Sequence, residues 1–371
     1  MKVCGIIAEF NPFHRGHEYI IKTARKQTGA DYIIVAMSGD YVQRGEPAIL
    51  DKHFRSKIAL SCGADLVLEI PGLAATGSAE YFARGSVALF NALGVVDILF
   101  FGSESGDLNN ATPLANGHLS PNDLLSAEYQ KALHFFSSSI TPMTTKRVGH
   151  GYHDADADAD HGKFCSATHL RDVLLKNEDL SLQKNKMPDE SYTVLIEAQK
   201  CCSFLSFSDF SLLLYQKLLE LHPSGYENYF DIFSDLSNKI RSNLPDFQNA
   251  DAFRMLLKSK DIAYTHISRG LLHILLDYTK EDVDFYVQNG YLSYLRLLGF
   301  SEKATPLLSE IKKNCALPLI SKPADAGKLL SAVAYNLFEK DIRASHLYQM
   351  VAKKDKNACI PSEYRRSPII L

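Results

Sequence analysis

The chain has 371 residues, of which 46% are hydrophobic and 22% are charged, and its formal net charge is −3. This composition excludes a largely disordered protein, and the length predicts two domains because it exceeds what one compact core usually contains. The small negative charge excludes a strongly basic nucleic-acid binder but leaves room for a local basic face.

Cysteine usage and the absence of long apolar runs predict the cellular setting. The seven cysteines are scattered without a CxxC pair, so we expect neither disulfides nor a structural zinc site. The apolar run 1–8 is too short for a signal peptide, and no later run is long enough to span a membrane. We therefore expect a reduced, cytoplasmic protein without a membrane partner.

Short apolar runs alternate with helical patterns in the first part of the chain. The runs expected to be buried strands are 3–8, 32–37, 66–70 and 98–101, and the expected helices are 17–27, 53–61 and 78–91. This alternation predicts right-handed βαβ units and a Rossmann-like, doubly wound parallel sheet. Ligands of such sheets bind at the carboxyl ends of the strands. Polar motifs begin there, at Glu9, Ser38 and Gly102.

The first of these motifs is the run EFNPFHRGH at residues 9–17. Pro12 biases Asn11 to an extended conformation, so the strand ends in a turn. Gly16 allows close approach of a ligand, and the helix that follows presents free N–H groups and its positive dipole end to an anion. His14 and His17 are three residues apart, so both rings are expected to donate hydrogen bonds to one phosphate group. In the alternative, one histidine only caps the helix and the other packs; the combination with Gly16 between a strand and a helix favours phosphate binding.

A second phosphate cradle is predicted at residues 165–171, where Ser166 and Thr168 precede Arg171 at a helix start. By itself this motif indicates an ordinary N-cap with a solvated arginine. Together with the HxGH run it favours phosphate binding. The candidate catalytic residues are His14, His17 and Arg171.

Helical spacing dominates from about residue 189 onward. It covers 192–205, 210–221, 252–257, 267–276 and 326–338. We therefore divide the chain into a nucleotide-binding domain at residues 1–180 and a mainly α-helical domain at residues 190–371. Between them, segment 153–161 alternates Asp and Ala, and we expect a solvated loop because these residues are poor strand formers and their charges would line one face.

The HxGH run joined to Ser-x-Thr-x-x-Arg resembles the superfamily of HIGH nucleotidyltransferases and class I synthetases, whose fold is a Rossmann-like sheet. Within it, nearly the whole chain resembles the bacterial tRNA(Met) cytidine acetate ligases. The matching segments are 11–17 (NPFHRGH), 37–48 (MSGDYVQRGEPA), 101–104 (FGSE), 121–125 (PNDLL), 146–154 (KRVGHGYHD), 264–269 (YTHISR), 271–276 (LLHILL) and 294–300 (YLRLLGF). Segment 37–48 is the most specific, because general nucleotidyltransferases lack it.

The resemblance implies an enzyme that converts ATP and acetate into acetyl-adenylate and pyrophosphate, and then transfers the acetyl group to N4 of the wobble cytidine of elongator tRNA(Met). Acetate is ionised at neutral pH and attacks the α-phosphorus itself, so no covalent nucleophile is needed. Catalysis then consists of positioning and charge stabilisation, with Mg²⁺ as the expected ion and no metal-ligating side chains predicted. The residues that the resemblance and the second cradle place at the ATP site are Ile7, Ala8, Glu9, Phe10, Asn11, Pro12, Phe13, His14, Arg15, Gly16, His17, Glu18, Tyr19, Ile20, Gly102, Asn122, Arg147, Ser166, Thr168 and Arg171.

The sequence identifies the residues that contact acetate and tRNA less specifically than those of the ATP site. Ser38, Gln43 and Arg44 are candidates for contacts with acetate or the entering nucleotide, and a purely structural turn is an equal alternative. RNA binding is expected from phosphate contacts and stacking by basic and tyrosine residues of the later half. These residues are Arg269, Arg296, Arg343, Lys353, Lys354, Lys356, Arg365 and Arg366, with Tyr264, Tyr348 and Tyr364.

The chain departs from the family pattern in two places. The link between Glu104 and Asn122 is shorter than the family's, and the acidic ladder 154–160 precedes the Ser166 motif.

Two other functions stay open as alternatives. One is a nucleotidyltransferase that joins AMP or CMP to a small phosphorylated metabolite; segment 37–48 and the large second domain argue against it. The other is a non-catalytic RNA-binding protein on a nucleotide-binding fold, which would have no use for His14, Gly16, His17 and Arg171.

Overall fold

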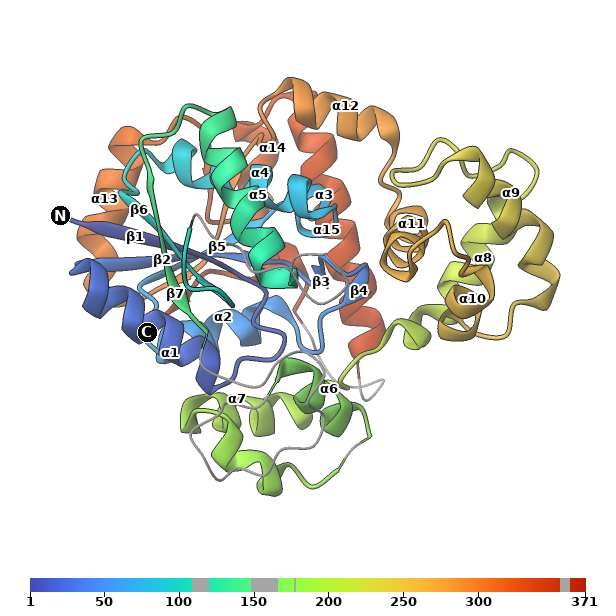
Figure 1. Ribbon diagram of the computed structural model, residues 1–371. Coiled ribbons are helices and arrows are strands. Elements are labelled where there is room, and N and C mark those ends of the chain that lie inside the picture. The colour runs from blue at the N-terminus through green and yellow to red at the C-terminus, as the bar shows by residue number, and fades with distance from the viewer. Residues whose placement is uncertain (109–119, 148–165, 177, 354–360) are drawn as a thin grey trace.

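The computed structural model describes residues 1–108, 120–147, 166–176, 178–353 and 361–371 (Figure 1). A central sheet carries helices on both faces, and two groups of helices project from it (Figure 1). The strands are β1 (Val3–Ala8), β2 (Tyr32–Ser38), β5 (Leu66–Ile70), β6 (Ile98–Ser103), β7 (Thr141–Lys146), β8 (Leu295–Phe300), β9 (Leu319–Ile320) and β10 (Ile369–Ile370), with β3 (Tyr41–Val42) and β4 (Glu46–Pro47) in a separate hairpin.

Neighbouring strands in the order β7-β6-β1-β2-β5 run parallel. The helices α1 (Arg15–Thr28) and α2 (Lys52–Ser61) cover one face of this sheet, and α3 (Gly72–Ala75), α4 (Ala79–Leu93) and α5 (Pro121–Phe135) cover the other. The strands are continuous apolar runs because both of their faces are buried. The predicted doubly wound sheet is confirmed.

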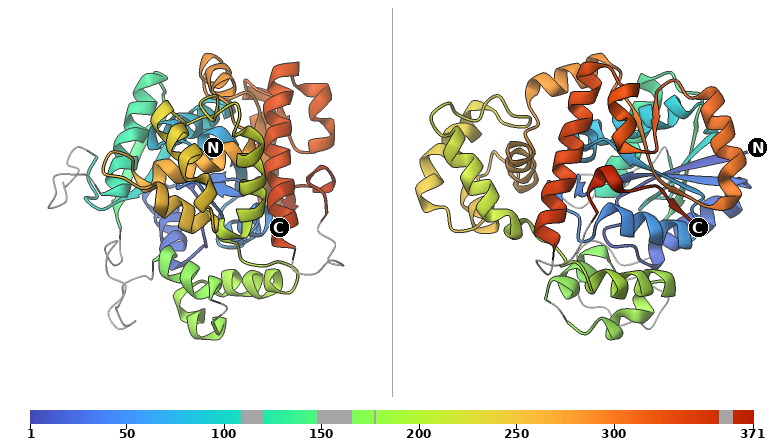
Figure 2. Two further views of the ribbon diagram at one scale, coloured as in Figure 1. Left: turned by 90° about the vertical axis from the view of Figure 1, so that its right-hand side faces the viewer. Right: turned by 180° about the vertical axis from the view of Figure 1, so that it is seen from behind.

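The remaining helices follow in three groups. Two of them, α6 (Ala167–Leu175) and α7 (Asp189–Gln199), pack below α2 and the first turn of α1 (Figure 1). A helical lobe projects to one side of the molecule, at the right in Figure 1 and at the left in the right-hand view of Figure 2. It consists of α8 (Ser211–Leu221), α9 (Ser234–Asn243), α10 (Ala250–Leu257) and α11 (Tyr264–Leu276). The chain then returns to the sheet through α12 (Lys280–Gln288), α13 (Thr305–Asn314), α14 (Ala326–Leu329) and α15 (Ala332–Ala352).

Short 3₁₀ helices connect several of these elements. They are Leu180–Lys186, Phe207–Phe210, Leu244–Asp246, Glu302–Ala304, Pro323–Asp325 and Glu363–Arg365. None of the helices in the described part of the chain combines the length and apolar character that a membrane span requires. The described cysteines, Cys4, Cys62, Cys201, Cys202 and Cys315, are free thiols.

The second half of the chain contributes strands that helical spacing did not predict. β8 pairs with β5 in the antiparallel direction, and β9 and β10 pair with β8. The sheet is therefore mixed at this edge, and residues 190–371 are not helical throughout. A short apolar run such as 295–300 does not distinguish a strand from a helix by periodicity, and its partner β5 lies more than 200 residues away. The division into 1–180 and 190–371 stays a prediction about folding units.

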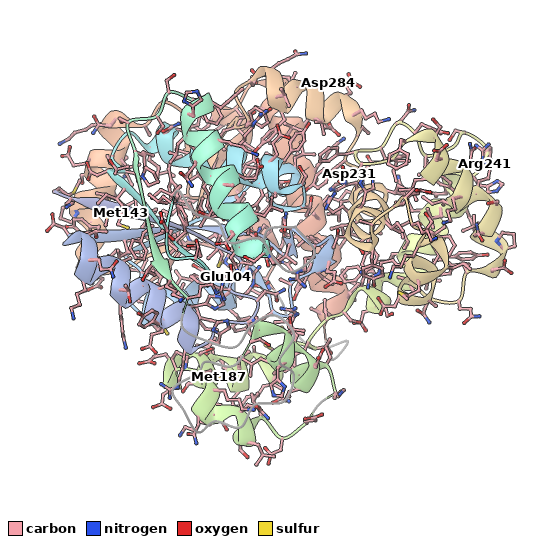
Figure 3. The ribbon with its side chains drawn as sticks, viewed as in Figure 1. Glu104, Met143, Met187, Asp231, Arg241 and Asp284 are labelled. Carbon is pink, nitrogen blue, oxygen red and sulfur yellow. The ribbon has the colours of Figure 1, made fainter. Side chains whose placement is uncertain are left out.

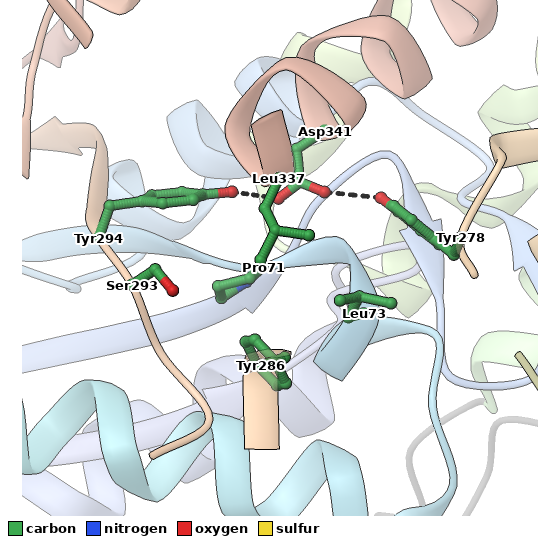
Figure 4. Close-up of a pocket in the computed structure, with 8 residues that line it drawn as sticks. All are labelled: Pro71, Leu73, Tyr278, Tyr286, Ser293, Tyr294, Leu337 and Asp341. Atoms are coloured by element: carbon green, nitrogen blue, oxygen red, sulfur yellow. Dashed lines mark hydrogen bonds between the residues drawn. The ribbon is translucent and has the colours of Figure 1, made fainter. Parts of the chain in front are cut away.

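The carboxylate of Asp341 on α15 joins this returning segment to the rest of the fold. Its Oδ1 accepts a hydrogen bond from the Tyr278 hydroxyl at 2.6 Å, and its Oδ2 accepts from the Tyr294 hydroxyl and from the Gly72 N–H at 3.1 Å. Figure 4 shows the two tyrosines pointing at Asp341 from opposite sides. Tyr278 follows α11, Tyr294 leads into β8 and Gly72 begins α3. One carboxylate thus fixes the relative positions of three elements.

Removal of this carboxylate should destabilise the protein more than removal of either phenol. We expect Asp341→Ala to lower the free energy of unfolding by about 3 kcal/mol, because it leaves buried donors without an acceptor, and Tyr278→Phe or Tyr294→Phe to lower it by about 1 kcal/mol each. Urea denaturation measures all three. An Asp341→Ala variant as stable as Tyr278→Phe would show that the carboxylate does not organise this junction.

Candidate active site

Two histidines cap the first turn of α1, directly after the turn that ends β1. His14 is the N-cap residue, and its Nδ1 accepts a hydrogen bond from the Gly16 N–H at 3.0 Å. In return, the His17 Nδ1 accepts from the His14 N–H at 3.3 Å. The rings stack with centroids 3.7 Å apart. The arrangement is a reciprocal capping box made of histidines, so both of them cap the helix.

Capping fixes the tautomer of both rings. Burial lowers the pKa of His14 to about 3, with Arg147 and Arg171 acting in the same direction. Burial, followed by His14 and Arg147, also lowers the pKa of His17 well below its usual value. A neutral imidazole has one donor and one acceptor nitrogen. Because each Nδ1 accepts a backbone N–H, each proton lies on Nε2, which leaves two Nε2–H donors for an anion.

The turn between β1 and α1 is a buried frame for this pair. Phe10 has a positive φ of 49°, and the rings of Phe10 and Phe13 pack against His17 with centroids 5.0 and 5.6 Å away. The Asn11 Oδ1 accepts a hydrogen bond from the Ile49 N–H at 2.7 Å, and the Phe13 carbonyl accepts from the Ser191 hydroxyl at 3.1 Å. These atoms therefore hold the turn in place.

The predicted second cradle lies beside this turn. Arg171 on α6 donates from Nη1 to the Asn11 carbonyl at 2.8 Å and from Nη2 to the Thr168 hydroxyl at 3.1 Å. Ser166 is the N-cap of α6, and its hydroxyl accepts from the His169 N–H at 3.2 Å. Arg171 thus connects α6 to the turn before α1, and its charge lowers the pKa of His14.

The third part of the site is a chain of contacts from β6 to α5. Gly102 lies close to α1 and Arg147, since a Cβ there would be 3.0 Å from Ile20 Cδ1 and 3.1 Å from Arg147 Cγ. Arg147 Nη1 donates to Asn122 Oδ1 at 2.9 Å. The Asn122 amide in turn donates to Glu104, which also accepts from the Ser120 hydroxyl at 2.6 Å. Figure 3 shows Glu104 beside the first turn of α5.

Glu104 and Arg55 are structural residues of the site that the sequence analysis did not select. Glu104 orients the carboxamide of Asn122, and its place in the matching segment 101–104 was the available signal. Arg55 on α2 is fully buried and donates to the carbonyls of Leu50, Glu9 and Ser38 at 2.8, 2.6 and 3.1 Å, and to Gly39. It clamps the carboxyl ends of β1 and β2 together. The sequence signal for Arg55 was its place on the expected helix 53–61, three and four residues before the apolar positions Ile58 and Ala59.

The substrate candidates of segment 37–48 lie in different environments. Ser38 is fully buried, and its hydroxyl has no hydrogen-bond partner in the structure. The Gln43 N–H donates to Glu9 Oε1 at 3.0 Å. Burial and Arg171 lower the pKa of Arg44, whereas Glu9 and Glu46 oppose this change. Arg44 lies in the turn between β3 and β4, where the charges of Glu9, Arg171 and Glu46 act on it, whereas the Ser38 side chain is buried.

The other residues predicted at the ATP site lie along β1 and the first turns of α1. Ile7 and Ala8 end β1, Tyr19 and Ile20 are on α1, and Pro12 follows Asn11 in a cis peptide bond. Arg15 donates from Nε to the Asn185 carbonyl at 2.8 Å, and Glu18 forms an ion pair with Lys22 on its own helix.

The basic residues predicted to contact RNA differ in their exposure to solvent. Arg343 and Arg365 are exposed. Arg296 is only 2% exposed and donates to the carbonyls of Ile320 and Ser321, so the expectation for this residue is wrong. Tyr348 is buried as well, and Arg269 and Arg366 are held in ion pairs with Asp231 and Asp51. Lys354, Lys356, the acidic ladder 154–160 and most of the Glu104–Asn122 link lie outside the described residues.

Comparison with known proteins gives the same assignment along the whole chain. A family model described as HIGH Nucleotidyl Transferase matches residues 1–118 and 113–361. A tRNA(Met) cytidine acetate ligase of Thermoanaerobacter sp. (strain X514) is 34% identical over 401 residues, which cover 96% of this chain and 97% of the relative. One of Acetivibrio thermocellus is 32% identical, with full coverage of both chains.

Solved structures agree with the sequence comparison. The chain is similar to Thermotoga maritima TmcAL in its apo form, with a TM-score of 0.90, 27% identity and full coverage of both chains. It is also similar to the same protein bound with alpha-thio ATP, with a TM-score of 0.88, 26% identity and coverage of 100% of this chain and 99% of the other. A close structural relative therefore binds an ATP analogue.

The double role of the histidines predicts that capping and ATP binding separate in suitable variants. Ser at position 14 and Glu at position 17 are the residues of the standard capping box, and neither carries a side-chain N–H donor. We expect His14→Ser and His17→Glu to unfold within about 1 kcal/mol of the parent protein but to bind ATP about 10- to 100-fold more weakly. Calorimetric titration with ATP measures the affinity.

His14→Ala is the matched control, because it removes both functions and should lose stability as well as affinity. If His14→Ser and His17→Glu bound ATP as tightly as the parent protein, the two histidines would be helix caps only.

Proposed function

The chain belongs to the tRNA(Met) cytidine acetate ligases within the HIGH nucleotidyltransferases, and we propose that it activates acetate with ATP and transfers the acetyl group to N4 of the wobble cytidine of elongator tRNA(Met). The observation that carries this proposal is the pair of neutral, stacked histidines at the N-terminus of α1, with Arg147 and Arg171 close enough to affect their pKa values. Neutral donors next to guanidinium groups suit a polyanion such as the triphosphate of ATP.

In the first step an acetate oxygen attacks the α-phosphorus of ATP, and pyrophosphate leaves. The developing negative charge falls on the bridging and terminal oxygens of the leaving group. The Nε2–H groups of His14 and His17 and the guanidinium groups of Arg147 and Arg171 are the donors that this chain offers there. Because their capping and hydrogen bonds hold them in place beforehand, little reorganisation is needed when the charge develops.

In the second step the cytidine amino group attacks the acetyl carbonyl of the adenylate, AMP leaves, and the amino nitrogen loses a proton. The base has to be turned out of the anticodon loop to reach the adenylate, as single-stranded bases are when proteins recognise them. Arg44 lies in the turn of the hairpin β3–β4, and the charge of Arg171 acts on it. We place the entering nucleotide beside this residue. A tRNA substrate also places the reaction in the cytoplasm.

Mg²⁺ fits this proposal as an ion that accompanies ATP. In the described residues, no group of three or more His, Cys, Asp or Glu side chains is arranged to hold a metal. Mg²⁺ in nucleotide sites is held largely by phosphates and water, so such a group is not required. The bound ion would neutralise phosphate charge, while the histidines and arginines orient the triphosphate.

The purified full-length chain should exchange labelled pyrophosphate into ATP when acetate is present and tRNA is absent. Addition of elongator tRNA(Met) should then give N4-acetylcytidine at the wobble position, detected by nucleoside mass spectrometry. We expect His17→Ala to lower exchange by at least about 100-fold, because a donor to the leaving group is lost, and to leave tRNA binding unchanged.

The rival functions give different results in the same assay. Exchange that needs a phosphorylated metabolite and no carboxylate would identify a nucleotidyltransferase that joins a nucleotide to that metabolite. RNA binding without exchange or acetyl transfer would identify a non-catalytic RNA-binding protein.

A further inference from the structure

The hairpin formed by β3 and β4 is held from two sides by different parts of the chain. On the ATP side, its Gln43 N–H donates to Glu9, and the following Ile49 N–H donates to Asn11. Both acceptors lie in the turn that leads to His14. We call this turn, residues 9–14, the ATP loop. The hairpin is therefore held to the ATP loop by hydrogen bonds that do not involve the helical lobe.

On its other side the hairpin touches the backbone of the helical lobe. Gly45 has a φ of +75°, and a Cβ there would lie 2.4 Å from the Arg269 nitrogen and 2.5 Å from the Ser268 carbonyl carbon on α11. No side chain fits between the hairpin turn and α11. The lobe and the turn are thus in direct contact, and a displacement of α11 acts on the turn immediately.

An ion pair next to Gly45 strengthens this contact. Arg254 on α10 donates from Nη1 to Glu46 Oε1 at 3.0 Å and to the Ser268 hydroxyl at 3.1 Å. The guanidinium is 4% exposed, is also bonded to Asp251, and lies over the rings of Phe207 and Tyr264 at 4.7 and 5.0 Å. Four residues, from α10, α11 and the 3₁₀ helix Phe207–Phe210, therefore fix Arg254, and through it the carboxylate of Glu46.

Arg44 is the residue between these two attachments, since the Gln43 N–H before it is bonded to Glu9 and Gly45 after it contacts α11. Its charge interacts favourably with the carboxylates of Glu9 and Glu46 and unfavourably with Arg171. The first carboxylate belongs to the ATP loop, and the second is held by the lobe through Arg254. The position of Arg44 therefore depends on both parts of the protein at once.

We propose that Arg254 is a positioning residue for the acetyl-transfer step, which acts through Glu46 to hold Arg44 at the entrance for the tRNA nucleotide. This inference rests on the proposed function. Formation of acetyl-adenylate depends on the ATP loop, whose bonds to the hairpin persist without Arg254. Transfer also needs Arg44 in place, because the proposed function puts the acceptor nucleotide beside this residue.

Glu46→Gln is the direct test, since it removes the charge of the pair while Arg254 keeps Asp251 and Ser268. We expect Glu46→Gln and Arg254→Met to lower the rate of acetyl transfer to tRNA about tenfold and to leave acetate-dependent pyrophosphate exchange within about twofold of the parent protein. Arg254→Lys should recover part of the transfer rate. The double variant should be no slower than Arg254→Met, because the two residues act as one unit.

Lys217→Met is the matched control. It breaks an ion pair of the same lobe, in which Lys217 Nζ lies 3.1 Å from Asp277 Oδ1, and this pair is not part of the hairpin contact. We expect it to change neither activity. Transfer and exchange that fall together with the unfolding temperature, or transfer unchanged in Glu46→Gln, would overturn the positioning role. A parent protein that shows neither activity would instead contradict the proposed function.

Discussion

The capping box at the start of α1 is the interaction on which the site depends. A helix N-terminus needs acceptors for its free N–H groups, and here the acceptors are the Nδ1 atoms of His14 and His17. Satisfying the helix therefore decides where the imidazole protons are. The same bonds that begin α1 leave two Nε2–H donors free for the phosphate contacts that we propose, so the capping role and the proposed binding role belong to the same residues.

Burial keeps this arrangement in one protonation state. The pKa of His14 falls to about 3 because the ring is buried, and the charges of Arg147 and Arg171 act in the same direction. If His14 were protonated, its Nδ1 would become a donor and lose the bond from the Gly16 N–H. In this proposal the neighbouring arginines supply the positive charge of the site, and the neutral histidines supply N–H donors of fixed orientation. This division of labour suits a reaction whose substrate is a polyanion and whose leaving group gains charge.

The sequence predicted the parts of this site that depend on local order. The apolar runs, Pro12 and the HxGH spacing specify a strand, a turn and a helix start, and the structure has them at those positions. The role of Arg55 was not predicted, because its contacts with Glu9, Ser38 and Leu50 exist only after β1, β2 and α2 have packed together. For the same reason β8 was missed: its partner β5 is remote in sequence, and Arg296 inside it finds its acceptors only in the folded chain.

The tautomer of the two histidines is the most direct measurement of this account. Long-range ¹⁵N–¹H correlation spectra of the ATP-free protein at pH 7 distinguish a protonated Nε2 from a protonated Nδ1 in each ring. We expect both rings to be neutral with the proton on Nε2, and His14 to begin to titrate only toward a pKa of about 3. A proton on Nδ1 in either ring, or a His14 pKa near 6.5 in the folded protein, would contradict the coupling between helix capping and phosphate binding.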